Sequence, residues 1–297
     1  MNSPAMKPAS MIMTEEKAIR NAMIRADMLA AQNTHGGPFG SVILAADGSI
    51  LGEGRNEVVH NHDPSCHAEM QALRDAGKNQ GFWHLKGATL VTSCECCPMC
   101  LAGAYAAGVE RIIFGNTRKD AANIGFADDA IYEEMSVDFR TLPIERIASS
   151  EHLTNADAAV IDAQGKVLAT AKAVQGNVDD PTAIPSVIAI GKACAAVDNF
   201  HLPEGCTLIT RKTVHPLGYT AARWAHIAHI HCLDTFSWEG AERSRHHPEL
   251  IYLDIALPMT HMQQRRIPME QFEHHETLQQ TLATFGKWFN DQNKVLY

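Results

Sequence analysis

The chain has 297 residues, of which 45% are hydrophobic and 20% charged, as in an ordinary globular protein. Its length corresponds to about two domains, and no apolar run reaches the roughly 18 residues that a membrane span needs. Lysine and arginine total 25 against 34 acidic residues, without the basic cluster that binding a nucleic-acid backbone calls for. Residues 1–16 lack the apolar core of a secretory signal. The sequence therefore predicts a cytoplasmic protein with a small-molecule substrate and neither a nucleic-acid nor a membrane partner.

The N-terminal part predicts one sheet with helices packed on it. Apolar residues at helical spacing favour a helix over 14–32. Asp47-Gly48 is typical of a tight turn and predicts a hairpin between strands over 39–44 and 50–54. The pattern continues with a helix over 67–74, a strand over 88–92, a helix over 97–107 and a strand over 109–114.

The C-terminal part repeats this order of elements. Residues 88–113 align with 206–231 without a gap, and seven of the 26 pairs are identical. We infer an internal duplication that divides the chain into domains over 1–150 and 151–297. Chance similarity between two alternating segments is the alternative interpretation.

Two short motifs carry residues that suit a metal centre: His67-Ala68-Glu69 and, beginning 30 residues after His67, Cys97-Pro98-Met99-Cys100. A catalytic zinc ion takes three protein ligands and keeps a fourth position for water. Proline suits the first turn of a helix, where free backbone N–H groups stabilise thiolates. The motifs therefore predict zinc as the cofactor, with His67, Cys97 and Cys100 as its ligands.

Glu69 is the predicted general acid and base. Residues two apart on a helix do not share a face, so His67 binds the metal while Glu69 is directed past it. Zinc lowers the pKa of a bound water to about 7, and a glutamate beside it moves the proton. His-x-Glu followed by Pro-Cys-x-x-Cys is the signature of zinc-dependent base deaminases. This chain departs from the signature at Cys96, where the pattern has proline.

The run Cys94-Glu95-Cys96-Cys97 offers a second Cys-x-x-Cys frame. We favour the pair Cys97 and Cys100, because only that pair lies at the helix start marked by Pro98. The alternative is a closed zinc site with four protein ligands, in which the fourth would be Cys66, Cys94 or Cys96.

From about residue 35 to 152 the chain resembles the cytidine-deaminase-like zinc family, and within it the guanine and guanosine deaminases. The resemblance rests on Gly37-Pro38-Phe39-Gly40, on segments 62–73 and 93–100, on Ile124-Gly125-Phe126-Ala127-Asp128-Asp129 and on the last residues, 294–297. It implies an α/β fold: a three-layer α/β/α sandwich around a mixed sheet, here duplicated in tandem. Residues 1–150 would be the catalytic zinc deaminase domain.

The resemblance also implies substrate contacts. Asn56 is similar to the asparagine that bonds the base edge, Phe39 to the residue stacked on a purine, and Asp128 to the acidic group that accepts from guanine N–H groups. Ala68 is expected to contact the substrate, and Tyr297 to close the pocket. The alternatives are a core role for Phe39, a turn role for Asn56, helix capping for Asp128 with Asp129 in its place at the base, and a frayed end for Tyr297.

The second repeat has lost the predicted zinc site. The positions of His67, Glu69, Cys97 and Cys100 are occupied there by Ile188, Ile190, His215 and Gly218. We expect residues 151–297 to form a degenerate deaminase-like domain with a C-terminal tail, serving as a built-in pairing partner. The histidines at 226 and 229 leave a second metal site open as a lesser alternative.

The sequence thus predicts an enzyme of purine metabolism. The expected reaction is hydrolytic deamination of guanine to xanthine or guanosine to xanthosine, with release of ammonia, in a homo-oligomer such as a dimer. The first alternative is another aminated heterocycle, such as cytosine or a triazine amine; the acidic net charge disfavours tRNA adenosine. The second alternative is a non-catalytic, zinc-stabilised scaffold or regulatory subunit.

Overall fold

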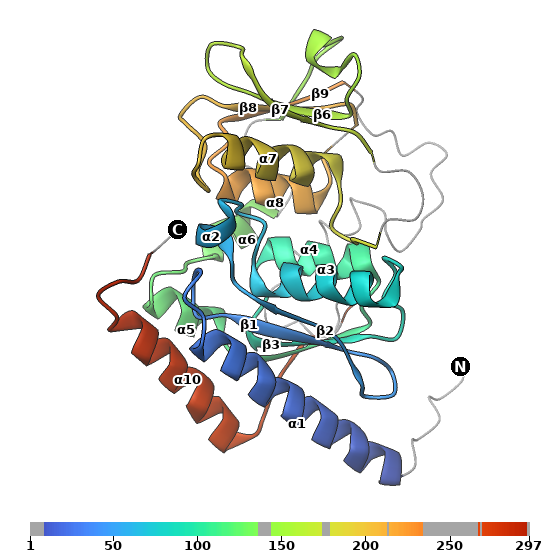
Figure 1. The fold of residues 1–297 in the computed structure, drawn as a ribbon, viewed down its shortest axis with the longest axis vertical. Helices are drawn as coiled ribbons and strands as arrows, with labels where there is room; N and C mark the ends of the chain where they lie inside the picture. Colours follow the sequence, from blue (N-terminus) through green and yellow to red (C-terminus); the bar gives the residue numbers. More distant parts are fainter. Residues whose placement is uncertain are drawn as a thin grey trace.

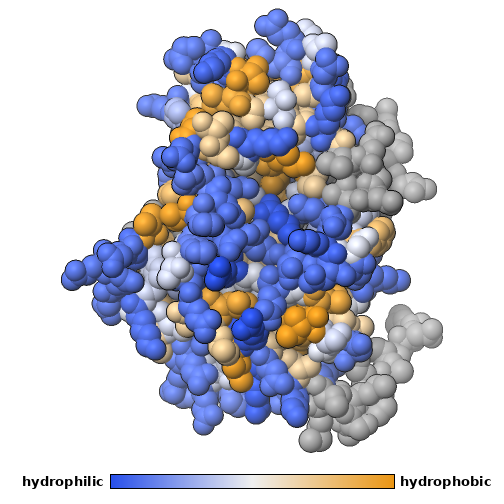
Figure 2. Space-filling model, viewed as in Figure 1, coloured by the Kyte–Doolittle hydropathy of each residue, from blue (hydrophilic) through white to orange (hydrophobic). Residues whose placement is uncertain are grey.

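A computed structural model describes residues 9–135, 144–173, 179–212, 214–233, 267 and 269–295. Within these ranges the chain forms two five-stranded mixed sheets with helices packed on them, one in each half of Figure 1. No helix in the described ranges combines the length and apolar character needed to cross a membrane. On the face shown in Figure 2, hydrophobic residues form separate patches among hydrophilic ones, as on ordinary protein surfaces.

The first sheet has the strand order β10-β4-β3-β1-β2. Strand β1 is antiparallel to β2 and β3, while β3, β4 and β10 run parallel to one another. The first four strands lie within two residues of their predicted ranges. The strands are β1 (Gly40–Leu44), β2 (Ile50–Arg55), β3 (Thr89–Cys94), β4 (Arg111–Asn116) and β10 (Met269–Gln271).

Helices cover both faces of this sheet (Figure 1). Side chains alternate between the faces: Val42 packs with α1, whereas Ile43 packs with the cluster that contains α3 and α4. Helix α3 ends six residues beyond its predicted range, at a left-handed Gly81. The helices of this half are α1 (Ala9–Ala31), α2 (Val58–Asn61), α3 (Ala68–Gln80), α4 (Pro98–Ala107), α5 (Arg118–Asn123), α6 (Asp129–Met135) and the C-terminal α10 (His275–Phe289).

The second sheet has the order β5-β9-β8-β6-β7, the same topology as the first. Matching antiparallel and parallel pairs recur at equivalent places, and the predicted α/β fold with tandem duplication is confirmed. Its elements are β5 (Ile144–Arg146), the 3-10 helix η1 (Glu151–Leu153), β6 (Ala158–Ile161), β7 (Val167–Ala171), α7 (Pro185–Ala196), β8 (Thr207–Thr210), α8 (Pro216–Trp224) and β9 (His229–Cys232).

The two sheets exchange their fifth strands. Strand β5, which follows the first four strands in the chain, pairs with β9 of the second sheet at Ile144 and Ile230. Strand β10, near the end of the chain, pairs with β4 of the first sheet at Met269 and Ile112. Each sheet therefore contains a strand from the other side of the predicted boundary. The division at residue 150 stays a prediction, and sheet membership does not follow it.

The two halves also share one apolar core, which contains residues of α3 and α4 together with residues of α7 and α8. At its edge the half-buried Arg74 donates from Nε to Thr182 Oγ1 over 2.8 Å and from Nη2 to Ser65 Oγ over 2.8 Å. His62 Nδ1 lies 2.8 Å from Asp198 Oδ1. The second half is thus packed directly on the helices that begin with His67 and Cys97.

Two glycines bring β2 into contact with α3. A Cβ atom on Gly54 would lie 2.2 Å from the carbonyl oxygen of Ala68 and 2.3 Å from the backbone nitrogen of Ala72. Gly52 stands equally close to Ala76. Because backbone atoms cannot move aside like the end of a flexible side chain, only glycine fits at these positions.

A Gly54→Ala variant is therefore expected to lose about 1–3 kcal/mol of unfolding free energy through overpacking, measured by urea denaturation. Gly286→Ala is the matched control: its Cβ would meet nothing within 4 Å on the exposed side of α10. That change should stabilise the protein by about 0.5–1 kcal/mol, since alanine is the better helix former. Equal stability of Gly54→Ala and the original chain would show that α3 moves freely away from β2.

Candidate active site

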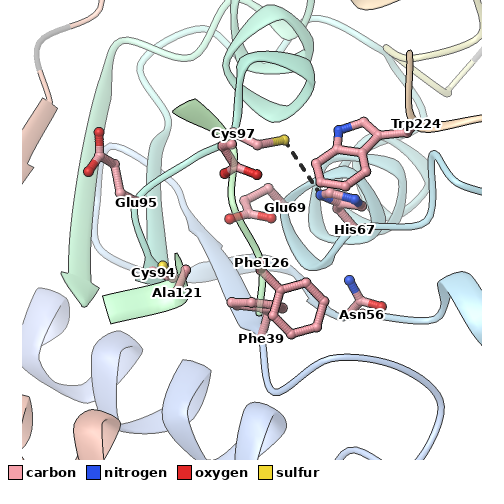
Figure 3. Close-up of a pocket in the computed structure, with 11 residues that line it drawn as sticks. Phe39, Asn56, His67, Glu69, Cys94, Glu95, Cys97, Ala121, Phe126 and Trp224 are labelled. Carbon is pink, nitrogen blue, oxygen red and sulfur yellow. Dashed lines mark hydrogen bonds between the residues drawn. The ribbon is translucent and has the colours of Figure 1, made fainter. Parts of the chain in front are cut away.

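The ends of two helices bring the three predicted zinc ligands together. His67 is the N-cap of α3, Cys97 is the N-cap of α4, and Cys100 lies in the first turn of α4. His67 Nδ1 lies 3.5 Å from Cys97 Sγ, the contact dashed in Figure 3, and 3.6 Å from Cys100 Sγ. The two sulfurs are 3.5 Å apart.

This cluster fits a zinc ion in its chemistry as well as its spacing. One imidazole nitrogen and two sulfurs lie within 4.8 Å of one another, the only such group in the described ranges. Burial opposes the charged form of Cys97, but hydrogen bonds from Cys100 and the nearby His67 hold the pKa of this thiol well below its usual value. Thiolates are the form that binds metals.

The extra cysteines stand outside this group. Neither Cys66, Cys94 nor Cys96 belongs to the cluster, so the described structure offers no fourth protein ligand for a closed site. Burial, followed by the charge of Glu69, raises the pKa of Cys94 and of Cys96 well above the usual value. Three ligands leave one position open, as a catalytic zinc requires.

Glu69 lies beside the cluster without belonging to it. Its Oε1 accepts a hydrogen bond from Thr92 Oγ1 over 2.9 Å, and its Oε2 lies 3.3 Å from Cys100 Sγ. The side chain is buried, and burial, followed by the charge of Cys97, raises the pKa of Glu69. A carboxyl group with a raised pKa next to a metal position is suited to taking up and returning protons.

A pocket opens in front of the cluster (Figure 3). The space among its lining side chains measures about 400 Å³, open solvent at the mouth included. Aromatic rings and a few polar groups form the walls. The lining residues are Phe39, Asn56, His67, Glu69, Cys94, Glu95, Cys97, Ala121, Phe126, Asp128 and Trp224.

Comparison with known proteins places this site in a family. Residues 13–116 match the cytidine and deoxycytidylate deaminase zinc-binding region. The guanine deaminase of Bacillus subtilis is 42% identical over 135 residues, which cover 44% of this chain and 86% of that protein. The chain belongs to this deaminase family. It is a zinc-dependent hydrolytic deaminase, and the predicted scaffold alternative is set aside.

Other members of the family are similar over shorter stretches. The tRNA-specific adenosine deaminase of Haemophilus influenzae is 34% identical over 39% of this chain and 68% of that protein. The cytosine deaminase of Candida albicans is 32% identical over 35% of this chain and 68% of that protein. The crystal structure of the Bacillus subtilis guanine deaminase covers 45% of this chain and 88% of that one, at 40% identity and a TM-score of 0.42. The sequence identities to these relatives establish the deaminase family, but the relatives differ in their named substrates, so the substrate has to be argued from the site.

Three of the predicted substrate contacts line the pocket of the deaminase: Phe39, Asn56 and Asp128. The Asn56 side chain accepts from the Val58 N–H over 3.3 Å, which holds the amide in place. Burial, followed by the charge of Cys97, raises the pKa of Asp128 well above its usual value. Ala68 begins α3, fully buried, and is not among the lining residues. The last predicted contact, Tyr297, lies outside the described residues.

Sequence reasoning gave no role to two aromatic residues of the pocket. Phe126 packs edge-on against Phe39, with ring centroids 5.0 Å apart. It belongs to the segment 124–129 that resembles the guanine deaminases, and this resemblance could have indicated a place in the pocket. Trp224 comes from the second half of the chain. In the gapless alignment of the repeats it stands opposite Ala106. The replacement of a small residue by a large aromatic one was the only feature of the sequence that set this position apart.

Proposed function

We propose that the deaminase converts guanine to xanthine, or guanosine to xanthosine, with the release of ammonia. The observation that carries this proposal is Asp128, a buried carboxyl group in an aromatic-walled pocket beside the metal cluster. The similarity to a guanine deaminase over 86% of that protein's length adds support. A homo-oligomeric enzyme of purine metabolism in the cytoplasm remains our expectation.

The reaction adds one water to the amine-bearing ring carbon and expels ammonia. Zinc, when bound, supplies Lewis-acid activation of that water. Glu69 lies within hydrogen-bonding reach of the site and takes the water's proton. It delivers this proton to the ring nitrogen, then takes the second proton from the hydroxyl group now on the ring carbon and passes it to the amine, which leaves as ammonia. Thr92, which donates to Glu69 Oε1, keeps the other oxygen turned towards the cluster.

Three side chains in the walls of the pocket favour guanine as the substrate. Phe39 offers a ring on which a flat base stacks, and the Asn56 amide bonds the edge of the base. Asp128 accepts from the adjacent N–H groups of guanine. Adenine presents a different set of donors and acceptors on that edge and leaves the buried carboxyl group unpaired, which is costly.

The test is ammonia release by the zinc-loaded protein with guanine, guanosine, adenine, cytosine and a triazine amine. We expect turnover of guanine or guanosine alone. The similarity to a cytosine deaminase makes cytosine the second candidate. Turnover of cytosine or the triazine amine, without guanine or guanosine, would keep the reaction class and contradict the proposed purine substrate.

An Asp128→Asn variant should lose about 5- to 150-fold in kcat/KM for guanine, because an amide nitrogen replaces one acceptor oxygen and leaves a buried guanine N–H group without its hydrogen bond. Asp129→Asn is the matched control, because the Asp129 side chain is 63% exposed and lies near Arg118. Its kcat/KM should stay within about threefold of the original value, as for a surface change. A larger loss at Asp129 than at Asp128 would assign base recognition to the neighbour.

A further inference from the structure

We propose that Trp224, from the second half of the chain, contacts the substrate in the deaminase site. The degenerate half would then complete the pocket rather than only stabilise the first half. This inference rests on the proposed function in one respect: the substrate is a flat aminated heterocycle held in the pocket described above.

The position of the indole carries the proposal. Trp224 lines the same pocket as Glu69 and Asp128. Its ring centroid lies 5.2 Å from that of His67, with the two planes at 62° (Figure 3). Trp224 Nε1 is buried and meets no hydrogen-bond acceptor among the described residues.

The fold holds Trp224 in place from the second half. It is the last residue of α8, whose buried face packs on α4 within the shared core. Helix α7 lies directly on the loop before His67: a Cβ atom on Gly191 would come 2.6 Å from Asp63 Oδ2. The contact between His62 and Asp198 holds the same loop. A ring anchored on the second half therefore stands at a defined place beside the metal cluster.

The asymmetry between the repeats argues for a role at the site. The second repeat has lost the residues equivalent to the zinc ligands and Glu69, yet it has a tryptophan where the first repeat has Ala106. With Phe39 and Phe126 from the first half, the indole gives the pocket aromatic walls from both halves. Stacking and edge contacts of this kind favour flat heterocycles of any base type.

The test compares Trp224→Ala and Trp224→Phe with the original protein, each loaded with zinc. Steady-state kinetics give KM and kcat, and metal analysis gives the zinc content. Binding without turnover is measured by fluorescence titration of guanine in a Glu69→Gln background. Thr182→Val is the matched control, because it removes the hydrogen bond from Arg74 between the halves and leaves the pocket untouched.

We expect Trp224→Ala to raise both KM and the dissociation constant about tenfold, the loss of one aromatic contact with a base, with kcat changed less than about threefold and zinc retained. Such a split marks an interaction made equally in ground and transition states. Trp224→Phe should recover most of the affinity, and Thr182→Val should lower the melting temperature without changing KM.

An unchanged KM in Trp224→Ala would overturn the proposal, as would loss of zinc from both Trp224 variants, which would assign the indole to support of His67. The proposed function fails separately, if the original protein releases no ammonia from guanine or guanosine. In that case the same variants are tested on the heterocycle that the original protein does convert.

Discussion

Replacing Glu69 with glutamine is expected to lower kcat by about 10²- to 10⁴-fold, the usual contribution of a general acid and base, while zinc stays bound. Glutamine has the same shape and keeps the acceptor oxygen that faces Thr92, but it cannot take up the proton. Glu69 is not part of the ligand cluster, so the metal content should not change. The measurements are ammonia release under saturating substrate and zinc per chain by metal analysis.

Thr92→Val provides the graded counterpart. It removes the donor to Glu69 Oε1 in a fully buried position, so the carboxyl group loses its orientation but keeps its proton chemistry. We expect a smaller fall in kcat, of about 5- to 15-fold for one lost hydrogen bond. If Glu69→Gln retained more than a tenth of the original kcat with zinc in place, another group would have to move the proton.

Cys100→Ala is the second change with a large expected effect: the protein should lose most of its zinc, and its activity with it. Removing one of three protein ligands leaves His67 and Cys97, which are too few for a stable zinc site. Cys100 also donates its backbone N–H to Cys97 Sγ over 3.5 Å, and that contact survives the change. Zinc per chain after dialysis should fall from about one to a small fraction of one.

Two controls separate this effect from the loss of any buried cysteine. Cys94→Ala tests the second Cys-x-x-Cys frame, and zinc should be retained because Cys94 lies outside the cluster. Cys194 lies in the apolar core on the side of the second half, so Cys194→Ala should leave both zinc and kcat unchanged. Full zinc loading of Cys100→Ala, with loss of zinc from Cys94→Ala, would mean that the second frame holds the metal.

The chemistry of the site could be predicted from the sequence because its parts are local. His67 and Glu69 share one helix start, and Cys97 and Cys100 share another with Pro98. Spacing within a single helical turn determines where such side chains point. The strand between the two helices, β3, sets the distance between the two helix starts. For the same reason the first four strands were found within two residues of their places.

The sequence by itself determined the order of the main elements over 14–114, the duplication and the zinc-binding set, since each depends on patterns of a few neighbouring residues. Only the tertiary structure decided which sheet each fifth strand joins: β5 and β10 span three residues each, too short to carry a pattern that selects a partner. It also decided that Trp224 stands beside His67, 157 positions away in the sequence. Contacts between the halves depend on packing over a shared core, and no local pattern encodes them.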